Sequence, residues 1–128
     1  MRWDPGVEIT FKAKSALTSK QAYIVELTAA DEVDVCNGAG DLPIGVLHDP
    51  SPGAGEACRV ALVGGGGIVS VVAGGVITAG DRVGTTAAGK GVTKTADADY
   101  IIGVAKTTSA ADGDLIEVIL GAGMQRAS

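Results

Sequence analysis

The sequence predicts an all-β protein: a small domain of two similar halves, with an extended N-terminal arm and few or no helices. Short runs of Val, Ile and Leu lie between Gly, Asp and Asn residues, which is typical of strands joined by tight turns. Nineteen of the 20 glycines lie from Gly38 onward, so turns divide most of the chain. Aromatic residues make up only 3% of the chain, and we therefore expect an aliphatic core.

The first 14 residues form the predicted N-terminal arm. Val7, Ile9 and Phe11 alternate with polar residues, a period of two that predicts a strand. Trp3 and Phe11 are two of the four aromatic residues of the chain. Two interpretations stay open: the arm docks on its own domain, or it adds a strand to a neighbouring subunit or to another protein.

An internal repeat follows the arm. The tripeptide IGV at residues 44–46 recurs 58 positions later at 102–104, and residues 54–62 align with residues 112–120 at the same offset. Upstream, residues 17–21 resemble residues 77–81 at an offset of 60. Two copies predict a duplicated single domain rather than a solenoid, which needs at least three.

The repeat sets the predicted boundaries. We place the duplicated β domain at residues 15–121, with halves at about 15–63 and 68–121 and a C-terminal tail at 122–128. Closing strands are predicted at 58–63 and 116–121, because their apolar residues alternate with Arg59 and Glu117. Weaker strands are predicted at 68–72 and 92–95, a flexible joint at 64–67, and the Ala-rich residues 29–32 are compatible with a helical turn.

Charge and hydropathy exclude several classes of partner. The net charge is −5 and the ten basic residues are scattered singly, so we expect no nucleic-acid partner. No uninterrupted apolar run approaches about 18 residues, and the start of the chain lacks a signal-peptide pattern. We therefore expect no membrane partner and synthesis in the cytoplasm.

Residues 84–91 nearly spell the phosphate-binding consensus G-x-x-x-x-G-K-[ST]. Gly91 stands where that consensus needs a hydroxyl for magnesium, and the β-type residues 92–95 follow where a helix is required. We expect a hairpin turn here and no bound nucleotide.

The remaining chemical groups predict no catalytic, cofactor or metal residues. His48 is the only histidine and no G-x-S-x-G elbow accompanies it, so we interpret it as a loop residue before Pro50. Cys36 and Cys58 are interpreted as small buried residues. The acidic groups lack calcium-loop spacing and are interpreted as turn and surface residues: Asp31, Glu32, Asp34, Asp97, Asp99, Asp112 and Asp114.

The phrases GGVITAGDRVGTTAAGKGV (74–92) and YIIGVAKTTSAADGDLIEVIL (100–120), with LPIGVL and GAGEACRVAL in the first half, resemble the capsid-cement family of tailed phages. The resemblance covers residues 15–121. It implies a role like that of lambda-type head decoration proteins, whose β-tulip or β-barrel domain sits as trimers on the capsid. The implied protein is a homotrimer made in the bacterial host cytoplasm. It binds the major capsid protein on the outer virion surface, stabilises the shell and has no catalytic residues.

By that analogy, we expect the arm to contact the capsid through strand addition to the major capsid protein, using Trp3, Pro5, Val7, Ile9 and Phe11. Two other functions remain open from the sequence. One is a surface module that binds a carbohydrate or a receptor. The other is a hydrolase that acts through residues 84–91 or through His48.

Overall fold

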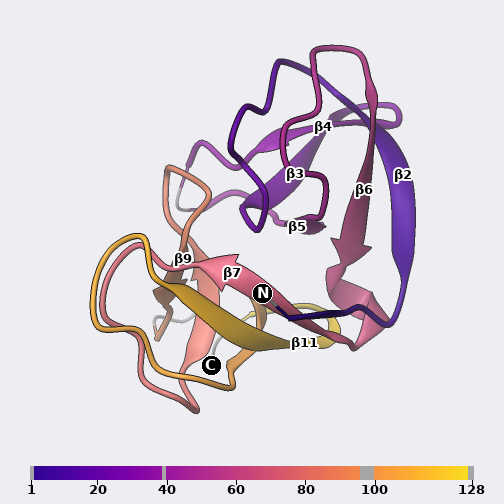
Figure 1. Cartoon of the computed structure of the whole chain (residues 1–128). Coiled ribbons are helices and arrows are strands. Elements are labelled where there is room, and N and C mark those ends of the chain that lie inside the picture. The colour runs from indigo at the N-terminus through magenta and orange to yellow at the C-terminus, as the bar shows by residue number, and fades with distance from the viewer. Residues whose placement is uncertain (1, 39, 96–99, 127–128) are drawn as a thin grey trace.

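The computed structural model describes residues 2–38, 40–95 and 100–126, of which 122–126 are described as backbone. Within these residues the chain is all-β, as predicted, with a single 3-10 turn at Val63–Gly65. The strands are β1 (Trp3–Asp4), β2 (Glu8–Ala13), β3 (Ile24–Ala29), β4 (Glu32–Val35), β5 (Gly45–Leu47), β6 (Ala57–Leu62), β7 (Ile68–Val72), β8 (Arg82–Thr85), β9 (Gly91–Thr93), β10 (Tyr100–Ala105) and β11 (Leu115–Arg126). Figure 1 shows the first half, indigo to magenta, above the second, which runs to yellow.

The first half is a closed barrel in the order β2-β4-β3-β5-β6. β2 pairs antiparallel with β6 along Glu8–Lys12, and closes the barrel through a short parallel contact with β4 at Lys12 and Ala13. β2 therefore has one long paired edge and one edge that is paired only at its end.

The second half is a six-stranded sheet in the order β1-β7-β11-β10-β8-β9. A parallel bridge between Ala73 and Gly91 brings β7 and β9 together across the sheet. β11 continues to Arg126 and pairs there with β10, so residues 122–126 of the predicted tail extend a strand. Residues 127–128 of that tail lie outside the described residues.

The two halves have the same strand order, which agrees with the repeat found in the sequence. Ala13 pairs with Val33 as Ala73 pairs with Gly91. The turn glycine of each half, Gly55 or Gly113, has a positive φ and donates its N–H to the equivalent carbonyl, that of Ala13 or Ala73. From the IGV strands onward the offset is 58, because β5 pairs with β6 in the register in which β10 pairs with β11.

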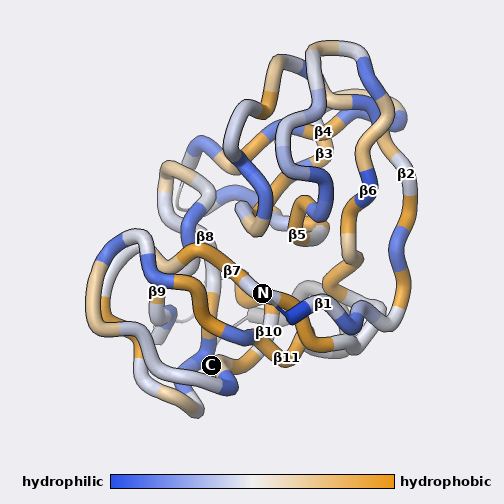
Figure 2. Tube along the Cα trace, in the orientation of Figure 1, coloured by the Kyte–Doolittle hydropathy of each residue, from blue (hydrophilic) through white to orange (hydrophobic). Residues whose placement is uncertain are grey.

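The core is aliphatic and has two parts. One cluster fills the barrel, with Val25, Val33 and Val60 among its members. The other spans both halves and includes Ile24, Val46 and Ala61 of the first half together with buried residues of β7, β8, β10 and β11. Figure 2 shows the hydrophobic segments concentrated along these strands. In the larger cluster, the buried side chains of the two halves pack against each other.

The predicted flexible joint at residues 64–67 is a structured turn. It connects β6 to β7 as expected, but a Cβ at Gly6 would collide with the carbonyl oxygen of Gly65, and one at Gly67 with the backbone of residues 4–6. The joint is therefore glycine-rich because two backbone segments touch there. The alternative helical turn at residues 29–32 is a β3–β4 hairpin, with Asp31 at φ 58°.

Candidate capsid-binding surface

The predicted arm is divided between the two halves. Trp3 and Asp4 form β1, which pairs with Val69 and Ile68 at the edge of the second sheet. The next strand, β2, belongs to the barrel of the first half. Figure 1 shows this segment running from the junction of the halves up one side of the barrel. The described part of the arm thus packs on the chain itself, through β1 and β2.

Trp3 is held by two residues that are distant in sequence from each other. Its ring stacks on His48 with 4.3 Å between the ring centroids, and its indole N–H donates to Glu8 Oε2 at 2.6 Å. His48 Nδ1 lies 2.7 Å from the same Glu8 oxygen, a close contact that lacks the direction of a hydrogen bond. The side chain of His48 therefore holds the arm, and the backbone N–H of His48 donates to the carbonyl of Arg59.

One edge of β2 remains open between Glu8 and Phe11. The N–H of Leu62 donates to the carbonyl of Val7, so the alternate residues Ile9 and Phe11 also turn their backbone groups toward β6. Glu8, Thr10 and Lys12 turn theirs to the other edge. Lys12 donates to the carbonyl of Asp31, whereas within the described residues nothing pairs with that edge from Glu8 to Phe11.

The apolar side chains of the arm differ in exposure. Val7 and Ile9 are each 45% exposed, whereas Phe11 is half-buried and packs against the barrel core. Pro5 is also half-buried. In β7, the repeat equivalents of Ile9 and Phe11 are Val69 and Val71, and both are fully buried. The arm therefore presents apolar surface beside an open strand edge, where its counterpart in the second half is covered.

An ion pair lies on β6, the strand that pairs with the other edge of β2. Arg59, which faces Thr10 across the β2–β6 ladder, contacts Asp49 Oδ1 at 2.9 Å through its guanidinium group. Burial acts to raise the pKa of Asp49, but the backbone N–H and the guanidinium of Arg59 together lower it below its usual value. Asp49 is thus a stable carboxylate that ties the 49–57 loop to β6.

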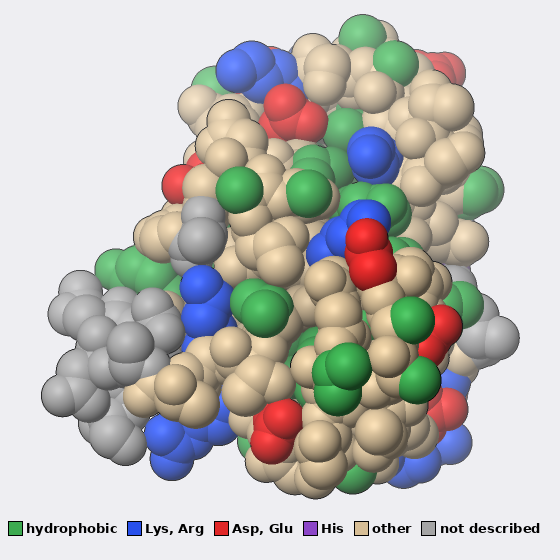
Figure 3. Space-filling view, turned by 90° about the vertical axis from the view of Figure 1, so that its left-hand side faces the viewer, with side chains coloured by type: hydrophobic (Ala, Val, Ile, Leu, Met, Phe, Trp, Pro, Cys, Tyr) green, Lys and Arg blue, Asp and Glu red, His purple; other side chains and the backbone are tan. Residues whose placement is uncertain are grey.

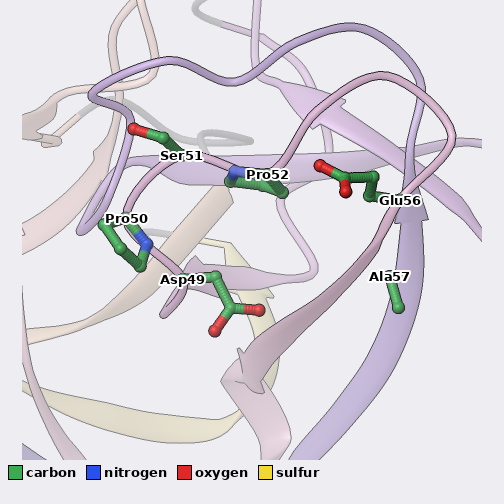
Figure 4. Close-up of a pocket in the computed structure, with 6 residues that line it drawn as sticks. All are labelled: Asp49, Pro50, Ser51, Pro52, Glu56 and Ala57. Atoms are coloured by element: carbon green, nitrogen blue, oxygen red, sulfur yellow. The ribbon is translucent and has the colours of Figure 1, made fainter.

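That loop frames a shallow hollow, shown in Figure 4, lined by Asp49, Pro50, Ser51, Pro52, Glu56 and Ala57. Its two carboxylates already have partners in the chain. Asp49 binds Arg59, and Glu56 Oε1 accepts the N–H of Gly53. Both carboxylates are therefore engaged within the chain.

Glu26, Cys36 and Asp41 form the one group of three potential metal ligands found among the described residues. Burial raises the pKa of Glu26, and its hydrogen bond with Asp41 raises it further, while the same bond lowers the pKa of Asp41. The two neighbouring carboxyl groups therefore differ in pKa, with Asp41 the more acidic of the two. Asp41 also accepts the N–H groups of Asn37 and Gly38, so the cluster closes a turn.

The other groups considered in the sequence have structural roles. Residues 84–91 form the β8–β9 hairpin, as predicted, and Lys90 pairs with Asp112 at 2.9 Å. Cys36 and Cys58 are free and buried, also as predicted. Asp34 accepts the hydroxyl hydrogen of Ser15 and Asp114 accepts two turn N–H groups, whereas Asp97 and Asp99 lie outside the described residues.

Sequence reasoning missed the partners of Trp3. No local pattern links Glu8 to His48, because their contact depends on the fold. The repeat alignment pairs Val46 with Val104 and Ala61 with Ile119. The structure buries the first residue of each pair and exposes the second, a difference that the alignment alone does not show.

On the face shown in Figure 3, acidic and basic side chains are interspersed and apolar side chains lie in small groups. Among the described residues there is no helix long and apolar enough to cross a membrane.

Comparison with known proteins places the chain in a structural class. Its sequence matches the phage cement protein family over residues 2–120, so the chain belongs to this family. Among solved structures it is similar to the N base of head fiber gp8.5 in bacteriophage phi29, with a TM-score of 0.65 and 18% sequence identity. That match covers 93% of this chain and 97% of the other. No curated protein matches the sequence.

The family match extends the resemblance inferred from residues 15–121 to include the arm. The protein is a capsid-associated structural component of a phage virion. The likeness to the phi29 head fiber base, at this level of identity, concerns the fold.

Proposed function

We propose that the protein binds the outer surface of the phage capsid as a homotrimer and stabilises the shell by adding a strand to the major capsid protein. The observation that carries this proposal is the open edge of β2 from Glu8 to Phe11, which lies beside the exposed side chains of Val7 and Ile9. An open edge presents unpaired N–H and C=O groups to an incoming strand, and adjacent apolar side chains supply specificity.

The repeat supports this role for the edge. In the second half, the equivalent edge of β7 is covered by β1, and the N–H of Ser70 donates to the carbonyl of Arg2. Strand addition therefore already occurs within the chain at one of two equivalent edges. A capsid strand on β2 would complete the other edge in the same way.

The packing of the arm supports a preformed site. Trp3, Glu8 and His48 lock β1 to the start of β2, and the close contact between Gly6 and Gly65 fixes the turn between them. A rigid edge loses little conformational entropy on binding. Many copies on one lattice then hold the shell through avidity, even if each contact is modest.

The experiment is cosedimentation with expanded capsids of the encoding phage, using Thr10→Pro. Proline removes the N–H that Thr10 turns to the open edge, and leaves the β2–β6 hydrogen bonds made through Ile9 and Phe11. We expect bound protein to fall at least tenfold with little change in the thermal midpoint.

Thr10→Ala is the matched control, because it changes the same side chain and keeps the N–H. It should bind as the unaltered protein does. Equal binding of the proline and alanine variants would show that β2 does not receive a strand.

A further inference from the structure

β2 and β7 occupy equivalent positions in the two halves, residue for residue. The N–H of Leu62 donates to the carbonyl of Val7 at the start of β2, and the N–H of Leu120 donates to the carbonyl of Gly67 at the start of β7. The offset along these two strands is 60, so each residue of β2 has its equivalent 60 positions later in β7. Contacts made at one strand can therefore be transferred to the other.

The edge of β7 shows how this fold receives a strand. β1 runs antiparallel to β7, with Trp3 directly opposite Val69. The N–H of Ser70 donates to the carbonyl of Arg2, so the neighbouring pair of Trp3 and Val69 is a non-hydrogen-bonded pair. In such a pair the two side chains lie on the same face and approach closely. Trp3 thus packs beside Val69, against the buried cluster that contains it.

The equivalent residue of β2 lacks that neighbour. Val69 is fully buried, whereas Ile9 is 45% exposed, although its cross-strand neighbour Val60 is fully buried in the barrel core. Ile9 turns its backbone groups to β6, so a strand on the open edge would also meet Ile9 in a non-hydrogen-bonded pair. The exposure of Ile9 is therefore what the fold shows when no residue stands in the place of Trp3.

The open edge receives only a short strand. At one end the β3–β4 hairpin closes it, because the carbonyl of Asp31 accepts the N–H of Lys12 at 2.7 Å. At the other end β2 begins at Glu8, directly after the turn that contacts the glycine-rich joint. The edge between these limits is comparable in length to the segment of residues 2–4 that covers β7.

We propose that the capsid strand received by β2 runs antiparallel to it and places a large apolar side chain opposite Ile9, as β1 places Trp3 opposite Val69. The proposal rests on the strand addition of the proposed function and adds the direction, register and chemistry of the partner strand. The backbone groups of Glu8 and Thr10 supply the hydrogen bonds. Burial of the exposed part of Ile9 beneath the incoming side chain supplies the apolar gain.

Photo-crosslinking to expanded capsids of the encoding phage tests the direction. The photoreactive residue p-benzoylphenylalanine is placed at Val7 in one variant and at Thr10 in another, since both positions are exposed. Mass spectrometry then identifies the labelled residues of the major capsid protein. We expect the residue labelled from Val7 to lie C-terminal to the residue labelled from Thr10, with a large apolar residue between them.

The control carries the same photoreactive residue at Val76, which is 69% exposed and lies outside the proposed site. It should not label the capsid segment that the other two variants label. Labelling of that segment from Val76 as well would mean that the reaction is not selective for the edge, and would overturn the register.

Ile9→Ala tests the side chain by cosedimentation with the same capsids. Because Ile9 is 45% exposed, the fold should persist, and a thermal melt checks this. We expect capsid affinity to fall about tenfold, because the apolar area available to the incoming side chain is lost. Ile9→Leu keeps that area and should bind within about twofold of the unaltered protein. Val76→Ala is the control and should bind as the unaltered protein does.

Labels in the opposite order would overturn the antiparallel direction and leave strand addition itself intact. A polar capsid residue opposite Ile9, or full capsid affinity in Ile9→Ala, would overturn the requirement for a large apolar side chain. No capsid label from either Val7 or Thr10 would overturn the register assigned to the partner strand. The comparison of Thr10→Pro with Thr10→Ala then reports separately whether strand addition at β2, and with it the proposed function, also fails.

Discussion

Gly45 and Gly103 occupy the same place in the two halves, each pressed against the backbone of the next strand. A Cβ at Gly45 would collide with the carbonyl oxygen of Ala61, and a Cβ at Gly103 with that of Ile119. These are the glycines of the two IGV tripeptides found in the sequence. The tripeptide therefore recurs because both halves pack a strand too closely for a side chain.

We expect Gly103→Ala to lower the free energy of unfolding by about 3 kcal/mol, because backbone must move to admit the methyl group. Gly45→Ala should have a similar effect. Gly75→Ala is the control, since nothing lies within 4 Å of a Cβ there and its φ is ordinary. Urea denaturation measures all three, and a Gly103→Ala midpoint equal to that of Gly75→Ala would contradict the packing described.

Residues 84–91, which nearly match the phosphate-binding consensus, give a second prediction. Two neighbouring residues of this β8–β9 turn should differ in their effect on stability. Gly89→Ala should destabilise the protein by about 2 kcal/mol, because φ is positive there and the new Cβ would collide with Val35 Cγ1. Lys90→Ala removes an ion pair with the exposed Asp112 and should change stability little. Thermal melting measures the loss of stability in each variant. A larger loss in Lys90→Ala than in Gly89→Ala would show that Lys90 has a role beyond the turn.

The all-β class, the repeat and the closing strands could be predicted from the sequence because each leaves a local pattern. The alternation of apolar and polar residues predicted β2 and the strands near residues 58 and 116. The recurrence of glycine at aligned positions predicted turns at Gly55 and Gly113. Barrel closure left no such pattern, because it depends on two parallel pairs between β2 and β4. The extension of β11 to Arg126 was missed because residues 121–123 read as a Gly-Ala-Gly tail.

The candidate surface was predicted in part. The alternation of Val7, Ile9 and Phe11 predicted a strand, but neither the exposure of Val7 and Ile9 nor the pairing of that strand with β6. The contacts of Trp3 with Glu8 and His48 arise only when β1 reaches the second half. The periodicity of a short segment does not show which distant strand it pairs with. The sequence therefore left open whether the arm docks on its own domain.

The cysteines give a third prediction. Burial is the main cause that raises the pKa of Cys36, to about 12, and burial also raises the pKa of Cys58. At pH 8, roughly one Cys36 in ten thousand is then the reactive thiolate. We expect neither thiol of the folded protein to react with Ellman's reagent within minutes, and both to react at once in guanidinium chloride. Fast stoichiometric labelling of the native protein would show that the core opens readily.

The ion pair between Asp49 and Arg59 predicts that the stability of the fold depends on pH. The pKa of Asp49 is lower in the folded protein than in the unfolded chain, so the unfolded chain takes up the proton first as pH falls. The stabilisation is therefore fully present above about pH 4 and is lost as pH falls through the folded pKa. Asp49→Asn should lower the free energy of unfolding by about 1 kcal/mol at pH 7, the contribution of a charge-assisted hydrogen bond, and by progressively less toward pH 3.

Unfolding by urea at several pH values measures that dependence. Asp112→Asn is the matched control: its carboxylate pairs with Lys90 but is 64% exposed, against 24% for Asp49, so solvent screens the pair. The two variants should differ most at neutral pH and converge in acid. A constant difference between Asp49→Asn and the unaltered protein from pH 7 to pH 3 would mean that Asp49 stabilises the 49–57 loop by shape rather than by charge.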